Sequence, residues 1–401
     1  MENRVQLKKN VNRNYVFILL QNIDLTRGIW MLYLASKGMS LTQLGLLETI
    51  FHITSFTMEV PTGAVADIFG RKISRILGRT FSLISVILLL VSNSFILFAI
   101  SFIFTALSYN LESGAGDALI YDSLKEIGEE ESYMKLNGNK EVFFQLASII
   151  SFLVGGYLAT KSYDIAFILT IIIGAITILQ SFTFKEPSIG KIKEKKDNIF
   201  ISQLKGSITV IKNRPKIAFL IVFTEFISTF GTCIFFYLQN YLKADGYNEA
   251  KIGFIYAISS VAVALVATQV HKIERKIKER GILLITPLLT AVSIWGIALS
   301  KYHYIFFILL MVTQGTLYVA MGDYINKMIP SENRATILSF SSMVFSFFMI
   351  TIFPLIGYIG DTYSLSTAFR YLGVLGIAIA LVNSYILIVK TNKVKLKKQN
   401  I

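Results

Sequence analysis

The chain is divided into apolar runs that are each long enough to cross a lipid bilayer as a helix. A helix needs about 20 apolar residues to span about 30 Å of hydrocarbon. Twelve runs meet this requirement: 15–36, 41–66, 73–92, 95–120, 141–160, 163–184, 216–242, 248–270, 282–300, 302–326, 335–359 and 366–390. They are continuous, whereas the strands of an outer-membrane barrel alternate over about ten residues. The sequence therefore predicts an all-α membrane protein with twelve transmembrane helices.

Composition and charge support this prediction. Of the 401 residues, 54% are hydrophobic and 16% charged, against roughly 25% charged in an ordinary soluble domain. The net charge is +14, and most Lys and Arg residues lie in the amino terminus, alternate loops and the carboxyl terminus. The opposite loops hold Lys37, Lys161, Lys243, Lys251 and Lys301. By the positive-inside rule both termini are predicted to be cytoplasmic, so the basic charge reflects orientation and attraction to lipid headgroups, not nucleic-acid binding.

A long polar interruption divides the spans into two groups of six. We expect an N-terminal six-helix bundle at 1–184, a cytoplasmic linker at 185–215 and a C-terminal six-helix bundle at 216–401. Within the linker, apolar residues recur at helical spacing: Phe200, Leu204, Ile208 and Ile211. This pattern predicts a short amphipathic helix on the membrane surface. The similarity of GAVADIFGRKI at 63–73 to ATQVHKIERKI at 267–277 indicates that the two halves are repeats.

The stretch EVPTGAVADIFGRK places charged residues and glycines directly after the second span. Gly63, Asp67, Gly70, Arg71 and Lys72 follow the order glycine, three residues, aspartate, two residues, glycine and two basic residues. This pattern resembles the loop motif between the second and third helices of the major facilitator superfamily. The segment SGAGDALIYDSL, near the fourth span, also resembles one common in bacterial members.

The resemblance implies two six-helix bundles that expose a shared cavity to each side of the membrane in turn. It also implies a latch between the bundles. Asp67 would cap the amino-terminal end of the eleventh helix near Arg334 in PSENRATILS, and Gly63 would allow close packing. The alternative interpretation is that Asp67, Arg71 and Lys72 are ordinary surface charges.

Ionisable side chains inside spans are functional candidates, because each costs about 2.5–3.5 kcal/mol at a helix centre. The acids are Asp24 in the first span, Glu48 in the second, Glu112 in the fourth and Glu225 in the seventh. A carboxylate that moves between wet and buried surroundings can take up a proton on one side and release it on the other. We therefore expect these four acids to be candidates for proton coupling, although Asp24 can also form a purely structural pair with Arg27.

The polar residues of the second, fourth and seventh spans lie on helical stripes that predict a central cavity. Glu48, His52, Ser55 and Glu59 form one stripe, and Ser101, Thr105, Ser108 and Glu112 form another. Near the cytoplasmic end, Asp117 and Asp122 are expected to be structural caps. With four acids against one arginine counted inside the spans, the cavity is expected to favour cationic or neutral amphipathic substrates. The candidate cavity residues are Arg27, Tyr33, Tyr109, Phe236, Tyr237, Gln239 and Tyr318.

These observations predict a secondary transporter in a bacterial inner membrane, most similar to proton-coupled drug exporters of the superfamily. Gly155 and Gly156 are what the chain retains of the glycine-rich run in the fifth helix of such exporters. The alternative is an uptake symporter or facilitator for a small nutrient or metabolite, which Arg27 favours if the substrate is an anion. A receptor without transport activity is the third possibility.

Other classes of function have little support in the sequence. GGYLATKS at 155–162 lacks the glycine that a phosphate-binding loop places before its lysine. His52, His271 and His303 are too scattered for a metal site. We expect no enzymatic activity, no metal and no cofactor. The expected partners are a small-molecule substrate, protons and the lipid bilayer, and the expected state is a monomer.

Overall fold

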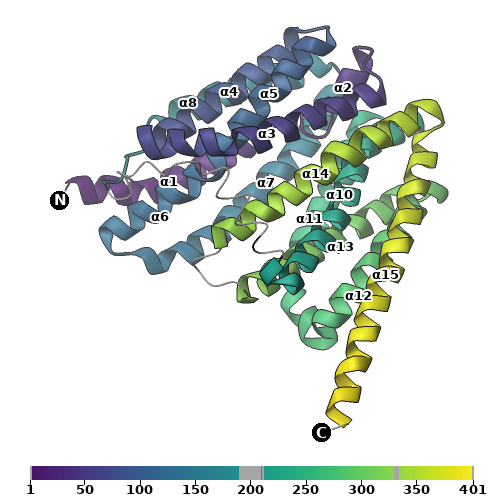
Figure 1. Cartoon of the computed structure of the whole chain (residues 1–401). Helices are drawn as coiled ribbons and strands as arrows, with labels where there is room; N and C mark the ends of the chain where they lie inside the picture. Colours follow the sequence, from purple (N-terminus) through teal and green to yellow (C-terminus); the bar gives the residue numbers. More distant parts are fainter. Residues whose placement is uncertain (1, 189–208, 210–211, 329–333, 400–401) are drawn as a thin grey trace. The chain divides into compact units, whose positions relative to one another are not determined.

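A computed structural model describes residues 2–188, 209, 212–328 and 334–399, and the secondary structure in these ranges is helical (Figure 1). The chain forms two compact units. Unit 1 comprises Met1–Ser202 with Leu242–Ala257, and unit 2 comprises Gln203–Tyr241 with Ile258–Ile401. The surface helix expected over 200–211 lies outside the described residues, apart from Thr209.

Unit 1 is built mainly from the first half of the chain. Its elements are α1 (Glu2–Asn22), α2 (Trp30–Ser36), α3 (Leu41–Phe69), α4 (Arg71–Val91), α5 (Phe95–Ser113), α6 (Ala115–Ile127), the 3₁₀ turn η1 (Glu130–Ser132), α7 (Tyr133–Ala159) and α8 (Tyr163–Ser181). In Figure 1, α4 lies beside α5 and α8, and both neighbours pack against it. The start of α3 is set by a capping box, in which Ser40 and Gln43 bond each other's backbone N–H groups.

Unit 2 contains most of the second half of the chain. Its elements are α10 (Pro215–Ala244), α11 (Glu249–Ala267), α12 (Val270–Leu299), α13 (His303–Met328), α14 (Arg334–Thr362) and α15 (Leu365–Gln399). The end of α10 and the start of α11 belong to unit 1. α12 packs against both α13 and α15.

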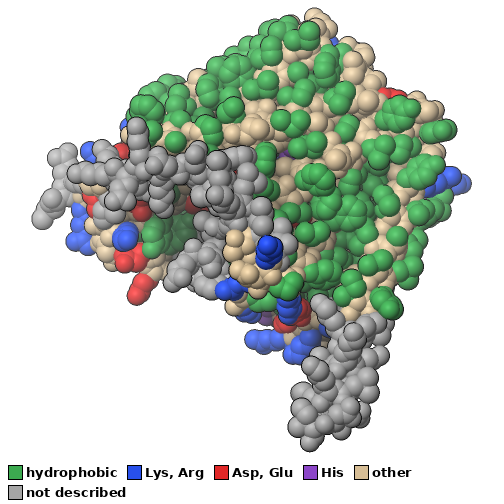
Figure 2. All heavy atoms as spheres, viewed as in Figure 1, with side chains coloured by type: hydrophobic (Ala, Val, Ile, Leu, Met, Phe, Trp, Pro, Cys, Tyr) green, Lys and Arg blue, Asp and Glu red, His purple; other side chains and the backbone are tan. Residues whose placement is uncertain are grey.

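The helix lengths suit a bilayer. Among the described residues, ten helices are long and apolar enough to cross a membrane, so the count of twelve spans and the cytoplasmic position of both termini stay predictions. Figure 2 shows apolar side chains spread over much of the visible surface. Ile96 and Leu179 are about 70% exposed, at 71% and 69% respectively. Such exposure of large apolar side chains fits a surface that faces lipid tails.

The first predicted helix is interrupted, and this prediction was wrong in detail. The run 15–36 was predicted as one helix, but α1 ends at Asn22 and α2 begins at Trp30. The run 95–120 contains α5 and α6, which meet at Gly114, but the backbone there is helical (φ −93°, ψ −37°) and Phe95–Ile127 forms one candidate span, as predicted. A hydropathy pattern reports only the length of an apolar run. It does not detect a break in the helix whose backbone groups are hydrogen-bonded by other parts of the protein.

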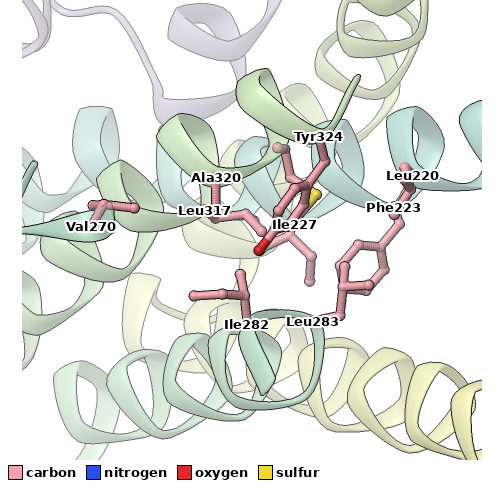
Figure 3. Packing of buried hydrophobic residues seen from close by; sticks show 10 residues of the cluster. Leu220, Phe223, Ile227, Val270, Ile282, Leu283, Leu317, Ala320 and Tyr324 are labelled. Carbon is pink, nitrogen blue, oxygen red and sulfur yellow. The ribbon is translucent and has the colours of Figure 1, made fainter. Parts of the chain in front are cut away.

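Each unit has its own apolar core. In unit 2, side chains from α10, α12 and α13 meet in the cluster drawn in Figure 3. Its members include Phe223, Ile227, Ile282 and Leu317. In unit 1 a cluster joins α1 to α6 and includes Leu7, Phe17, Leu119, Leu124 and Phe184. The first half of α1 therefore packs against α6.

Candidate functional site

The break in the first span places Asp24 on an unwound segment whose backbone is satisfied by side chains. The backbone N–H of Asp24 donates to Ser151 Oγ at 3.0 Å, and that of Leu25 donates to Thr170 Oγ1 at 3.2 Å. The Asp24 carboxylate accepts hydrogen bonds from the backbone N–H and the hydroxyl of Thr26, at 2.9 and 2.6 Å. Unpaired backbone groups are costly in a membrane, so these bonds allow the helix to be broken at this point.

Arg27 lies on the same unwound segment, close enough to Asp24 for the two charges to interact. Its Nη1 donates to Ser148 Oγ at 2.8 Å, and its guanidinium lies 5.4 Å from the centre of the Phe144 ring. The structure therefore brings together the pair that the sequence singled out. A carboxylate and a guanidinium on unwound backbone can move with less disturbance than groups on a continuous helix.

Two glycines of α7 have distinct neighbours. A Cβ added at Gly155 would overlap the carbonyl oxygen of Leu25 on the unwound segment. A Cβ added at Gly156 would lie 2.6 Å from the carbonyl oxygen of Glu249 and 3.1 Å from the Cα of Gly253. At both glycines the backbone of α7 lies directly against the backbone of another segment. For Gly155 that segment is the unwound part of the first span.

The stripe on α3 is buried at Glu48 and His52, half-buried at Ser55 and Glu59, and partly paired with α5. Glu48 and His52 are 8% and 7% exposed. Ser55 donates from its hydroxyl to Asn110 Oδ1 at 2.7 Å, and the Asn110 amide donates to the Ser55 carbonyl at 2.7 Å. Within the described part of the chain, the carboxylate of Glu48 has neither a hydrogen bond nor an ion pair.

Glu112 of α5 forms a buried ion pair with Arg75 of α4. Arg75 donates from Nε and Nη2 to Glu112, with the shortest distance 2.8 Å, and from Nη1 to Asn14 Oδ1 at 3.0 Å. Its guanidinium also lies 3.9 Å from the Phe17 ring centre and 4.7 Å from that of Phe184. The Arg75 side chain is 1% exposed and that of Glu112 is 15% exposed. This pair is almost fully desolvated and fully bonded.

Arg75 and Arg79 were missed by the sequence analysis, which counted Arg27 as the one arginine inside the spans. Both lie in the candidate span Arg71–Val91. Their signal was present in RKISRILGRTF, where Arg71, Arg75 and Arg79 recur at intervals of four residues and so share a face of α4. Their position near the end of an apolar run made them look like loop charges.

The loop motif forms a network inside unit 1. Gly70 has φ +100°, and both oxygens of Glu186 cap the start of α4 by accepting from the backbone N–H groups of Arg71 and Lys72 at 2.8 and 2.7 Å. A Cβ at Gly70 would lie 2.9 Å from that carboxylate. Arg71 also forms an ion pair with Asp122. Asp122 was expected to be a structural cap, and its observed contact is this ion pair with Arg71; Glu186, which caps α4, was not foreseen.

The other members of the loop motif have fewer contacts. Asp67 is exposed at the end of α3, near Arg71. A Cβ added at Gly63 would meet no atom within 4 Å in the part of the chain that the structure describes. The segment expected to receive Asp67 includes residues 329–333, which lie outside the described residues. The latch therefore stays a prediction.

In unit 2 the candidate acid is Glu225 of α10. Its Oε1 accepts a hydrogen bond of 2.5 Å from the hydroxyl of Ser341 on α14. Among the described residues, Glu225 has no ion pair. It is therefore a half-buried carboxylate held by a neutral donor, unlike Glu112.

The aromatic candidates for the cavity lie in different surroundings. Tyr33 is 1% exposed and donates to the carbonyl oxygens of Leu89 and Leu90 at the end of α4. Tyr237 is fully buried and donates to the Phe353 carbonyl at 3.0 Å. The rest are placed as follows: Gln239 is fully buried, Phe236 packs against Phe353, and Tyr109 and Tyr318 are 59% and 77% exposed. Tyr33 and Tyr237 thus have clear packing roles.

No metal site is found among the residues that the structure describes, as judged by groups of three or more His, Cys, Asp or Glu side chains. The single Cys233 is buried within α10. The ionisable groups inside the helices are therefore arranged as separate pairs and single acids.

The chain is similar in sequence to a family of transporters and in fold to solved transporter structures. The sequence profile of the Major Facilitator Superfamily matches residues 16–303. The uncharacterized MFS-type transporter YxaM of Bacillus subtilis (strain 168) is 25% identical over 348 residues, which cover 85% of this chain and 86% of that protein. The nucleoside transporter NupG has a TM-score of 0.76 at 14% identity, covering 96% of this chain and 99% of that chain. A D-xylose-proton symporter has a TM-score of 0.71 at 14% identity, covering 94% of this chain and 97% of that chain. These two likenesses concern the fold.

Proposed function

The chain belongs to the Major Facilitator Superfamily, and on this premise we propose that it is a proton-coupled secondary transporter that exports amphipathic cationic or neutral compounds, drugs among them. In this proposal it lies in a bacterial cytoplasmic membrane and acts as a monomer. Two bundles, 1–184 and 216–401, alternate between two arrangements, and the loop motif with Asp67 favours one of them.

The observation that carries the proposal is the state of two acids inside the helices. Glu48 and Glu225 have no ion pair among the described residues, and the one hydrogen-bond partner seen there for the Glu225 carboxylate is the neutral Ser341. A carboxylate without a fixed counter-charge takes up a proton more readily than one held by a guanidinium, because an adjacent positive charge favours the ionised form. Glu48 and Glu225 are therefore better placed to carry protons than Glu112, which Arg75 neutralises.

The unwound segment supports a role for Asp24 and Arg27 in the transport cycle. Discontinuous helices in transporters expose backbone groups and side chains at the depth where substrates bind. The Asp24 carboxylate is bonded by Thr26, which lies two residues away on the same unwound segment. Asp24 can therefore exchange partners without unwinding more helix. We place Asp24 with the substrate-binding groups and retain it as a secondary candidate for proton coupling.

A second candidate function is uptake of a small nutrient or metabolite by a symporter or facilitator. The guanidiniums of Arg27, Arg75 and Arg79 favour it, because they offset the in-span acids more than the sequence suggested. The similar folds of a nucleoside transporter and a D-xylose-proton symporter are compatible with such a role.

Oriented vesicles separate the two functions. Everted and right-side-out vesicles from a drug-sensitive host that expresses the protein would be given a fluorescent lipophilic cation and an imposed pH gradient. The export proposal expects accumulation in everted vesicles with an acidic interior, and its loss on addition of a protonophore. Accumulation only in right-side-out vesicles would support uptake, and accumulation in neither would contradict the export proposal for this class of compound.

A further inference from the structure

Arg79 of α4 is a half-buried cation whose hydrogen-bonding capacity is nearly unused. A guanidinium offers five N–H donors, but in the described part of the chain the one partner of Arg79 is Ser108 Oγ, at 3.2 Å from Nη2. Its Nε is fully buried and bonds to no acceptor there. An arginine within a span is costly unless its charge and donors are satisfied.

The neighbouring groups do not neutralise Arg79. Glu112 is the acid whose charge acts on it, and Arg75 is a second cation whose charge opposes it. Both oxygens of Glu112 already accept hydrogen bonds from Arg75. With one carboxylate and two guanidiniums, the cluster of Arg75, Arg79 and Glu112 carries one excess positive charge.

The position of Arg79 is built into the packing of α4 against α5. A Cβ at Gly78 would lie 3.2 Å from the carbonyl oxygen of Ser108 and 3.4 Å from the Cβ of Leu111. This close contact brings the hydroxyl of Ser108 beside the guanidinium. Arg79 as a whole is half-buried, and its Nη1, which makes no hydrogen bond to the described residues, is not fully buried. This nitrogen is therefore the donor that a small group could bond.

We propose that Arg79 and Ser108 form a binding site for an anionic oxygen group, a carboxylate or a phosphate. Planar guanidiniums bind both groups through two parallel N–H donors, and a hydroxyl can supply a third bond. Arg75 is the structural cation of the cluster, and Arg79 is the ligand-binding one. The anionic group would belong to a lipid headgroup or, under the second candidate function, to a compound that is taken up, and in the latter case the proposal rests on that transport function.

The test measures binding without transport. Purified wild-type protein in nanodiscs of phosphatidylcholine would be titrated with sodium benzoate, and thermal unfolding would be followed at constant ionic strength. Benzyl alcohol and benzylammonium chloride are matched neutral and cationic probes, and inorganic phosphate is a second anionic probe. We expect benzoate or phosphate to raise the unfolding temperature and the two matched probes to have no such effect.

The variants assign the effect to a residue. Arg79→Gln should weaken the apparent affinity for the anion by about ten- to a hundredfold, the range for hydrogen bonds to a charged group. Arg79→Lys should give an intermediate value, because it keeps the charge but loses the planar fork. The control Arg280→Gln, which removes the same charge from an exposed position in unit 2, should bind as the wild type does.

A second arm separates the two sources of anion. Nanodiscs that contain phosphatidylglycerol would be compared with those of phosphatidylcholine alone. Stabilisation by phosphatidylglycerol that depends on Arg79, without an effect of benzoate or phosphate, would assign the site to a lipid headgroup. The proposal is overturned if none of these anions stabilises the wild type, or if Arg79→Gln binds them equally well. Neither result bears on proton coupling, which the vesicle experiment tests separately.

Discussion

Arg75 of α4 and Glu112 of α5 face each other in a two-pronged ion pair, with Nε and Nη2 of the guanidinium both directed at the carboxylate. Phe17 and Phe184 cover the guanidinium, and its Nη1 donates a hydrogen bond to Asn14 Oδ1. The pair joins two neighbouring helices of unit 1. It also explains how α4 tolerates a charged residue at 1% exposure.

Glu112→Gln should destabilise the protein strongly. It leaves Arg75 buried without a counter-charge, and loss of one partner of a buried pair costs about 3–5 kcal/mol. Thermal unfolding in detergent measures the effect. The control Asp323→Asn breaks an exposed pair with Lys327, and we expect it to cost at most about 1 kcal/mol. Equal effects of the two substitutions would mean that the buried pair is not a structural contact.

Glu186→Gln should weaken the start of α4. The carboxylate accepts from two backbone N–H groups at the positive end of the helix, and loss of such a cap costs about 1 kcal/mol. Limited proteolysis at the α3–α4 junction, together with thermal unfolding, would detect it. The matched control is Glu129→Gln, which breaks an exposed pair with Lys8. A Glu186 variant as resistant as the control would argue that the cap contributes nothing.

Gly155→Ala should damage the unwound segment. The added methyl group would overlap the carbonyl oxygen of Leu25, which is backbone and cannot rotate away. Overpacking of this kind costs about 1–3 kcal/mol, and displacement of the segment should also lower transport. Gly138→Ala is the control on the same helix, since its Cβ would meet nothing within 4 Å among the residues that the structure describes. Wild-type stability and transport in Gly155→Ala would show that the close approach is not needed.

The sequence predicted the features that a lipid bilayer imposes on a chain, namely apolar helices and the rare charged residues within them. Apolar length located the helices because a bilayer leaves a chain few other ways to satisfy its backbone. It also identified Asp24 and Arg27 as a pair, because charged residues are rare in such runs. The break around them was not predictable, since the hydroxyl groups that accept from its backbone N–H groups, those of Ser151 and Thr170, lie more than one hundred residues away.

The partners of charged groups were harder to predict than the groups themselves. The sequence identified Glu112, but its arginine comes from α4 and not from its own helix. The start of α4 is capped by Glu186, at the beginning of the linker, an acid that the sequence analysis did not single out. Pairing of this kind depends on which helices become neighbours, and one sequence does not fix that.

Asp67→Asn tests the latch. We expect slower turnover with unchanged substrate affinity and unchanged thermal stability, because an exposed carboxylate that bonds in one arrangement alone affects the rate of interconversion. Exchange of labelled substrate across proteoliposomes gives the turnover rate. Asp164→Asn, also exposed and in unit 1, is the control. Wild-type turnover in Asp67→Asn would identify Asp67 as a surface charge without a role in the cycle.

The central claim is that carboxylates without a fixed counter-charge carry the coupling proton, and Glu225→Gln tests it most directly. Proteoliposomes with an imposed pH gradient would be compared for uphill accumulation and for downhill exchange of the same substrate. Ser341→Ala removes the hydrogen-bond donor but keeps the acid, so it is the matched control. The account predicts that Glu225→Gln loses accumulation but retains exchange, and that Ser341→Ala retains both. Accumulation in Glu225→Gln with the same dependence on the pH gradient as the wild type would contradict it.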